Sequence, residues 1–142
     1  MAGPRRRFML ADIAQQLVGG FLLAGPFVVT EEVWVLASAM NPIQAGVAAL
    51  IVVLIGYGAL YKADDRDPDR ETEVGGIPLR FVSLMVVSFG SVLLLALVFD
   101  APDTFFTNLG VPREEWAFGT AKAVAIGAIF SVVGAATADS VF

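Results

Sequence analysis

The chain has 142 residues, of which 57% are hydrophobic, and its mean hydropathy is +0.76. This composition is too apolar for a water-soluble domain and indicates an integral membrane protein. The absence of Cys excludes disulfides and thiolate metal sites, and the absence of His removes the commonest neutral metal ligand and general base. We therefore expect no cofactor, no bound metal and no enzymatic activity.

The formal charge of −5, with seven Arg against two Lys, is typical of the acid-rich surfaces that a high-salt cytoplasm favours. This bias predicts a haloarchaeal origin. No nucleic-acid motif is present, so we expect no nucleic acid as a partner.

Four apolar stretches are long enough to cross a hydrocarbon core of about 30 Å, which takes about 20 helical residues. They predict a single all-α membrane domain over residues 1–142, with four transmembrane helices in an antiparallel bundle. The expected spans are residues 13–40, 43–61, 79–99 and 120–138. The chain is therefore expected to be a multi-pass protein of the cell membrane, with the lipid bilayer as a partner.

Most Arg and Lys residues near the span ends fall on one side of this topology. The positive-inside rule therefore predicts that both termini are cytoplasmic. Asp12 and the glutamates further on interrupt the apolar region that a twin-arginine export signal would need, so we favour an uncleaved first span. The residues on the cytoplasmic side are Arg5, Arg6, Arg7, Lys62, Arg66, Arg70 and Arg80, and those on the other side are Arg113 and Lys122.

The first apolar stretch, residues 13–40, would be about 42 Å long as a straight helix, which requires tilt or a bend. Gly25 and Pro26 are the expected bend, because proline removes a backbone hydrogen bond and collides with the preceding turn. A reversal at Asn41 and Pro42 then begins the second span, so the first two spans form a tight hairpin.

Glu31 and Glu32 lie inside this stretch, about 13 Å before Met40 along a helix, and so in the outer half of the bilayer. An ionised carboxylate that faces lipid there costs about 3 kcal/mol or more, so protein or water must shelter it. Helical phase favours Glu31 on an inward-facing polar stripe with Gln16 and Ser38. A sheltered carboxyl group that exchanges a proton suits a proton or cation relay; alternatively, one glutamate only fixes the kink.

Lys122 is the candidate counter-ion, because the fourth span enters the same leaflet from outside. Two interpretations remain open. Lys122 either pairs with Glu31 or Glu32, or shares a lipid-facing side with Ile126 and Ile129 and extends its ammonium group to the headgroups.

The connections differ in character. Residues 62–78 alternate in charge sign and predict a solvated cytoplasmic loop without the twelve-residue calcium pattern, and residues 100–119 predict an outer loop. Aromatic side chains near the span ends are expected to be interfacial anchors. These anchors are Trp34, Tyr57, Tyr61 and Trp116.

Small residues recur at helical spacing in the last three spans and allow helix backbones to approach closely in a bilayer. They predict a compact bundle with small-residue faces left over for self-association. The stripes are Gly46, Ala49, Val53 and Gly56; Ser83, Val87, Gly90 and Ser91; and Gly127, Ser131, Gly134 and Ala138.

The segment GPFVVTEEVW, residues 25–34, has a proline followed by Thr, Glu and an aromatic residue, namely Pro26, Thr30, Glu32 and Trp34. Here the chain resembles a family of uncharacterised prokaryotic, largely haloarchaeal, four-span integral membrane proteins of unknown function. Some members are roughly twice as long, which implies that this chain corresponds to one half. A homodimer would then rebuild the longer arrangement.

Together these features predict conduction or transport of protons or small ions past Glu31 and Glu32, by a homodimer or other homo-oligomer. The alternative is a non-transporting accessory or scaffold subunit, whose glutamates hold a kinked helix or a partner.

Overall fold

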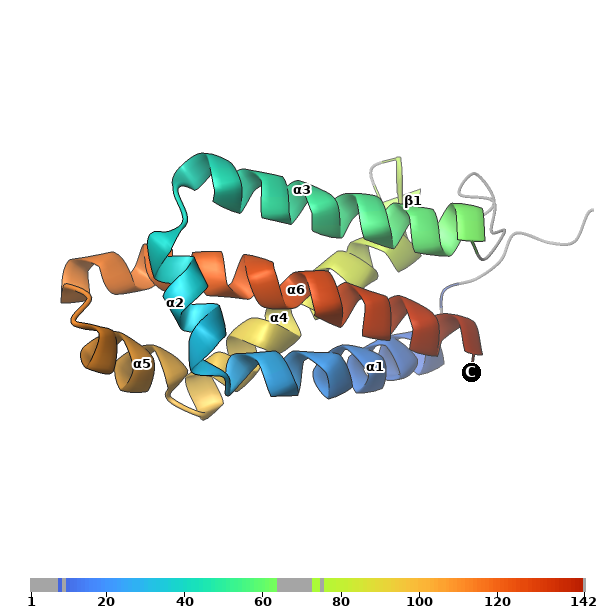
Figure 1. Cartoon of the computed structure of the whole chain (residues 1–142). Helices are drawn as coiled ribbons and strands as arrows, with labels where there is room; N and C mark the ends of the chain where they lie inside the picture. The colour runs from blue at the N-terminus through green and yellow to red at the C-terminus, as the bar shows by residue number, and fades with distance from the viewer. Residues whose placement is uncertain (1–7, 9, 64–72, 75, 142) are drawn as a thin grey trace, which may run out of the picture.

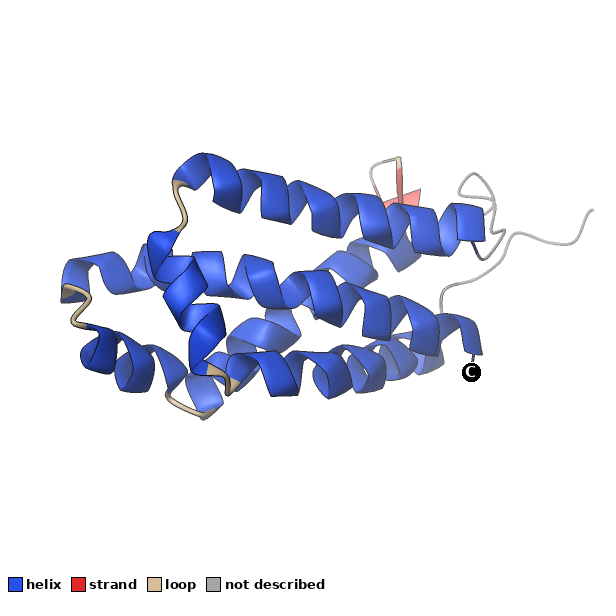
Figure 2. Cartoon of the chain, in the orientation of Figure 1, coloured by secondary structure: helices blue, strands red, loops and turns tan. Residues whose placement is uncertain are grey.

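The computed structural model describes residues 8, 10–63, 73–74 and 76–141, and this part contains four helices long and apolar enough to cross a membrane. The predicted all-α, four-span antiparallel bundle is confirmed, as Figure 2 shows. The four helices are α1 (Leu10–Val28), α3 (Pro42–Gly58, continued by the π-helical turn η1 at Ala59–Ala63), α4 (Leu79–Val98) and α6 (Trp116–Val141). Shorter helices α2 (Glu31–Ala39) and α5 (Ala101–Leu109) lie in the connections.

The two ends of the bundle differ in structure (Figure 1). At one end, which we name the terminal end, α1 begins, α6 ends, and the start of α4 lies beside them. At the opposite, hairpin end, α2 connects α1 to α3, and α5 leads from α4 toward α6. Helix α2 runs across the bundle rather than along it.

Helix α6 is the central helix. In its apolar segment 67% of residues are buried, against 22% to 33% in the other three spanning helices. It contacts α1, α3 and α4. Its sequence explains this position, since Gly and Ala are spread around its circumference and let neighbours approach on every side.

Helices α1 and α6 make backbone contact. A Cβ atom added to Gly19 would lie 2.1 Å from the Gly134 carbonyl oxygen, and one added to Gly134 would lie 2.2 Å from the Gly19 carbonyl oxygen. The small-residue stripe predicted in the fourth span is therefore confirmed as a packing face. By contrast, a Cβ atom on Gly46 or Gly90 would meet open space, so these parts of the other two stripes are not packed against another helix.

The first predicted span, residues 13–40, is two helices rather than one bent helix. Helix α1 continues through Gly25 and Pro26 and ends at Val28, and α2 begins at Glu31 in a new direction (Figure 1). The prediction that Gly25 and Pro26 mark the bend is therefore wrong by about one turn.

The local sequence explains where the break occurs. Val28, Val29 and Thr30 are β-branched and lose side-chain freedom in a helix. The Thr30 hydroxyl donates a 2.7 Å hydrogen bond to the Pro26 carbonyl, the acceptor that a continuing helix would offer to the Thr30 N–H. Trp34 donates from Nε1 to the Val28 carbonyl at 2.9 Å, which satisfies a terminal acceptor of α1.

The reversal into α3 agrees with its prediction. Asn41 caps the helix with Pro42 next to it, and its side chain accepts a 2.8 Å hydrogen bond from the Gln44 N–H. The Asn41 N–H in turn donates to Gln44 Oε1 at 2.9 Å. This reciprocal capping box satisfies two donors that the start of a helix leaves unpaired.

The expected outer loop over residues 100–119 is largely helical, which corrects the prediction. Asp100 and Gly110, with φ of 55° and 71°, are the N-cap and C-cap of α5 and hold left-handed conformations. A 3₁₀ turn, η3 (Arg113–Glu115), then leads directly into α6.

The expected cytoplasmic loop over residues 62–78 is described only in part. Strands β1 (Glu73–Val74) and β2 (Ile77–Pro78) form a short antiparallel pair. The acidic residues at 64–69, and Arg5, Arg6 and Arg7 of the orientation argument, lie outside the described residues.

The outer surfaces of the spanning helices carry large apolar side chains. Leu22 of α1, Leu54 of α3 and Leu94 of α4 are 68%, 61% and 52% exposed. Such a surface requires an apolar solvent, which agrees with contact between these helices and lipid.

Candidate functional site

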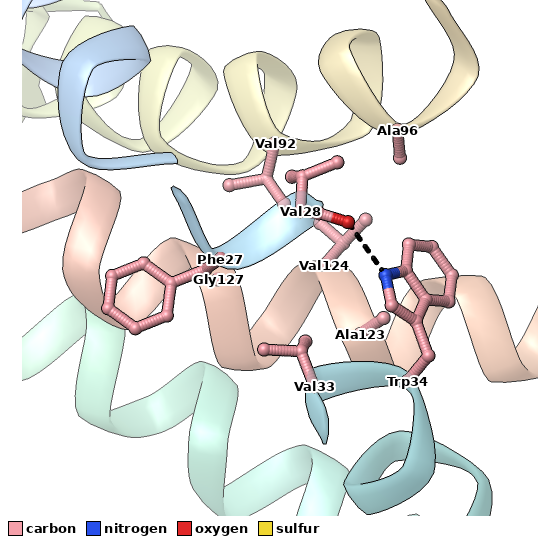
Figure 3. A pocket seen from close by; sticks show the side chains of 9 residues that line it. All are labelled: Phe27, Val28, Val33, Trp34, Val92, Ala96, Ala123, Val124 and Gly127. Carbon is pink, nitrogen blue, oxygen red and sulfur yellow. Dashed lines mark hydrogen bonds between the residues drawn. The ribbon is translucent and has the colours of Figure 1, made fainter. Parts of the chain in front are cut away.

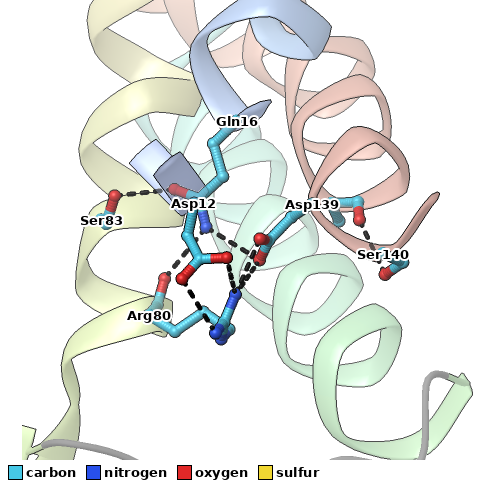
Figure 4. Close-up of polar contacts among 7 residues, drawn as sticks. Asp12, Gln16, Arg80, Ser83, Asp139 and Ser140 are labelled. Atoms are coloured by element: carbon cyan, nitrogen blue, oxygen red, sulfur yellow. Dashed lines mark hydrogen bonds and ion pairs between the residues drawn. The ribbon is translucent and has the colours of Figure 1, made fainter. Parts of the chain in front are cut away.

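Three charged side chains from three helices meet inside the terminal end (Figure 4). Arg80 of α4 donates from Nη1 to both carboxylate oxygens of Asp139 in α6, at 2.7 and 2.8 Å. Arg80 also contacts the Asp12 carboxylate of α1 at 3.3 Å. The side chains of Arg80 and Asp139 are 3% and 0% exposed, and that of Asp12 is 21% exposed. We name these three residues the ion centre.

Gln16 extends the ion centre one helical turn further into the bundle. Its Nε2 donates to Asp139 at 3.2 Å and to the Arg80 carbonyl at 3.4 Å, and its Oε1 accepts from Ser83 Oγ at 2.7 Å. Phe8 covers the Arg80 guanidinium, with its ring centroid 5.2 Å away. These contacts provide partners for polar groups whose burial would otherwise be costly.

A second polar layer lies near the middle of α1. The Ser131 hydroxyl of α6 donates to the Gly20 carbonyl of α1 at 3.1 Å and lies 2.9 Å from the Ser91 hydroxyl of α4. Gly20 follows Gln16 by about one helical turn. Polar groups therefore extend from the terminal end to about halfway along the bundle.

Beyond this layer the interior is apolar (Figure 3). A pocket at the α1–α2 break has about 200 Å³ of space between its atoms, but it is too narrow to hold a water molecule. The polar layers therefore do not continue to the hairpin end. The pocket is lined by Phe27, Val28, Val33, Trp34, Val92, Ala96, Ala123, Val124 and Gly127.

Glu31 and Glu32 are exposed in the first turn of α2. The prediction that Glu31 shares an inward stripe with Gln16 and Ser38 is wrong. Gln16 lies in the buried contacts at the terminal end, whereas Ser38 is exposed and donates to the Val35 carbonyl at 2.9 Å. The physical reason is the α1–α2 break, which resets the helical phase on which the stripe depended.

The glutamates follow an apolar helix that is itself long enough to cross the bilayer. Helix α1 has 19 residues, or about 28 Å, before the chain turns into α2. We infer that Glu31 and Glu32 lie at the edge of the apolar layer, where water reaches them. Their position in the first turn of α2 also places negative charge next to the positive end of that helix dipole.

Lys122 is buried, with 7% of its surface exposed. Its Nζ donates to the Met40 carbonyl at 2.8 Å and lies 4.7 Å from the Phe118 ring centroid. Within the described residues it forms no ion pair with Glu31 or Glu32, so the predicted pairing is wrong. The alternative, an ammonium group extended along lipid to the headgroups, is also wrong, because Lys122 is buried and its ammonium group binds the Met40 carbonyl. Instead the ammonium group donates a hydrogen bond to the carbonyl of Met40, the C-cap residue of α2.

A family model described as "Putative integral membrane protein (DUF2391)" matches residues 3–139. The chain belongs to this family. Neither the curated proteins nor the solved structures include a match. Membership of DUF2391, with the four apolar helices, establishes an integral membrane protein and confirms the resemblance to a membrane family at that level.

In this DUF2391 protein, the residues that carried the resemblance mostly build the α1–α2 break. Pro26 and Thr30 form the hydrogen bond that ends α1, and Trp34 binds the last carbonyl of that helix. Glu32 takes no part in these contacts.

Two of the four predicted interfacial anchors are core residues. Trp34 and Tyr61 are 1% and 5% exposed, so the anchor prediction is wrong for both. Tyr57 is 40% exposed and lies 4.9 Å from Tyr61 between ring centroids. Trp116 is half-buried, and its Nε1 donates to the Val111 carbonyl at 2.9 Å.

Sequence reasoning missed the ion centre as a group. It treated Arg80 as an orientation charge and Asp12 as an interruption of an export signal, and it did not consider Asp139. The usable signal was topological: in an antiparallel four-span bundle, the starts of spans one and three and the end of span four lie together. No cluster of three or more potential metal ligands occurs in the described part of the chain.

Proposed function

We propose that this protein transports protons or small cations, and that the ion centre, rather than Glu31 and Glu32, is the site it uses. The buried contact among Asp12, Arg80 and Asp139 is the observation that carries the proposal. Ionisable groups inside membrane helices are costly and typically mark ion or proton pathways. Carboxylates bind protons and cations directly, which favours these species over anions.

The two polar layers support a route that is open from one side. Asp12 is partly exposed at the terminal end, and Gln16 leads inward toward the Ser91–Ser131 pair. The dry pocket at the α1–α2 break closes the rest of the route toward the hairpin end. Discontinuous membrane helices line the sites of many transporters, so we propose that movement of α2 relative to α1 opens this pocket.

We also propose a homodimer. Gly90 on α4 faces open space and would let a second copy approach closely. Crosslinking in liposomes and native mass measurement in mild detergent should both give dimers, and a strictly monomeric result would contradict this part of the proposal.

Proteoliposome flux tests the proposed site. The wild-type protein should dissipate a pH gradient or a sodium or potassium gradient, and Asp139→Asn should lose most of that flux. Glu31→Gln and Glu32→Gln should keep it, as should Asp103→Asn, a matched change at an exposed acid of α5. Unfolding temperature and gel filtration must show that each variant is folded. Loss of flux in the glutamate variants alone would show that the site is misassigned.

A non-transporting accessory or scaffold subunit is the second candidate. The observation in its favour is that the charged groups of the ion centre are paired with one another while the route is closed. This role predicts no flux above empty liposomes, together with reduced stability of Asp139→Asn. Neither proposed role involves catalysis.

We propose a haloarchaeal cell membrane as the location, with both chain ends in the cytoplasm. The chain has no Cys, so single cysteines can report the orientation. Asn108→Cys in α5 should react with an impermeant thiol reagent added outside cells, and Ser140→Cys at the end of α6 should react only after permeabilisation. The reverse pattern would overturn the orientation.

A further inference from the structure

A groove of about 600 Å³ lies on the side of the bundle between α3, α4 and α6. Figure 1 shows why it forms, since α4 diverges from α3 toward the hairpin end and leaves α6 between them. Small residues form half of its lining, and Phe89 and Leu93 of α4 close one side. The small residues are Ala45, Gly46 and Ala49 of α3 and Ala117, Ala121 and Ala125 of α6.

Lys122 lies where this groove meets a second pocket. The second pocket, of about 190 Å³, is at the hairpin end and includes Ser38, Glu115 and Lys122 in its lining. An ammonium group has three donors, and the Met40 carbonyl takes one of them. A buried cation with spare donors therefore stands between an apolar groove and a smaller, more polar pocket.

We propose that the groove binds a hydrocarbon chain of an anionic phospholipid from the surrounding leaflet, with the lipid phosphate beside Lys122 in the second pocket. Charge complementarity supports this occupant, because no carboxylate pairs with Lys122 within the described residues. Its depth also fits: Nζ binds Met40 immediately before α3 enters the apolar layer, the level at which headgroups lie.

Glu115 carries a negative charge, like the headgroup proposed to bind beside it. Its exposed side chain lines the same pocket as Lys122, so it opposes an anionic headgroup there. Removing this charge should strengthen binding, whereas removing the charge of Lys122 should weaken it.

Native mass spectrometry of the full-length protein measures this directly. The probes are phosphatidylglycerol and phosphatidylcholine with identical chains, added at equal concentration to delipidated protein. The wild type should retain more phosphatidylglycerol, and Lys122→Gln should lower that preference about fivefold. Lys122→Arg should restore it, and Glu115→Gln should raise it.

Two matched controls separate a built site from general attraction. Arg113→Gln removes an exposed cation at the same end and should leave the preference unchanged. Gly46→Leu fills the groove without a backbone clash and should reduce binding of both lipids, whereas Gly58→Leu adds the same side chain to the same helix outside the groove and should not. Equal binding of the two lipids by the wild type would overturn the proposal, as would equal losses in each matched pair.

Discussion

The terminal end joins three helices through charged groups, whereas the hairpin end joins them through aromatic rings and single hydrogen bonds to backbone carbonyls. Arg80 contacts two carboxylates at the terminal end. At the hairpin end, Trp34 and Lys122 each bind one carbonyl, of Val28 and Met40. From this difference we expect the terminal end to be the more rigid part and the α1–α2 break to be the part that moves.

The largest effect should come from the backbone contact between α1 and α6. Gly134→Ala places a Cβ atom 2.2 Å from the Gly19 carbonyl oxygen, so the two helices must separate. We expect a loss of about 4 kcal/mol or more in unfolding free energy, measured by denaturation in mixed micelles. Gly58→Ala is the control, because its Cβ atom meets open space and alanine favours helix; it should be neutral or stabilise by about 0.5 kcal/mol.

Asp139→Asn should have the next largest effect on unfolding. It removes the charge from the two shortest contacts of Arg80, whose side chain is 3% exposed. Breaking a buried ion pair from one side costs about 3 kcal/mol. Asp103→Asn, at an exposed position, should change the unfolding free energy by about 0.5 kcal/mol or less. Equal effects would contradict the view that charges hold the terminal end together.

The four-helix bundle could be predicted from the sequence because the apolar composition of each long segment shows directly that it can span a membrane. The small residues of the last span likewise predicted a closely packed helix. The ion centre could not be predicted from spacing, because its members are separated by 59 and 68 residues and no local pattern links them. Only the antiparallel topology brings Asp12, Arg80 and Asp139 together.

The prediction of an inward-facing Glu31 was wrong for a different reason. Hydropathy continues without interruption across the α1–α2 break, so one 28-residue span seemed to contain both glutamates. What divides it is a set of specific contacts, from the Thr30 hydroxyl to Pro26 and from the Trp34 indole to Val28. A hydropathy average does not include such contacts. The run of β-branched residues before Glu31 was the local signal that indicated a helix end.

Trp34→Phe tests the mobile end directly. It keeps an aromatic side chain but replaces the buried indole with a smaller phenyl ring and removes the N–H that binds the Val28 carbonyl, so we expect a loss of about 2 kcal/mol. Hydrogen exchange around residues 28–34 should accelerate, and ion flux should rise if this break is the gate. Trp116→Phe removes a comparable hydrogen bond from a half-buried ring and should have a smaller effect. Unchanged exchange in both variants would leave the hairpin end as rigid as the terminal end.

Asn41→Ala should give the smallest effect, at the connection from α2 to α3. The change removes one half of the capping box, because the Asn41 side chain accepts from the Gln44 N–H. Loss of an N-cap costs about 1 kcal/mol. Asn108→Ala, at an exposed position in α5, should be close to neutral. If Asn41→Ala destabilised the bundle as much as Asp139→Asn, both ends would be held equally tightly, and α2 would no longer be the natural candidate for the moving element.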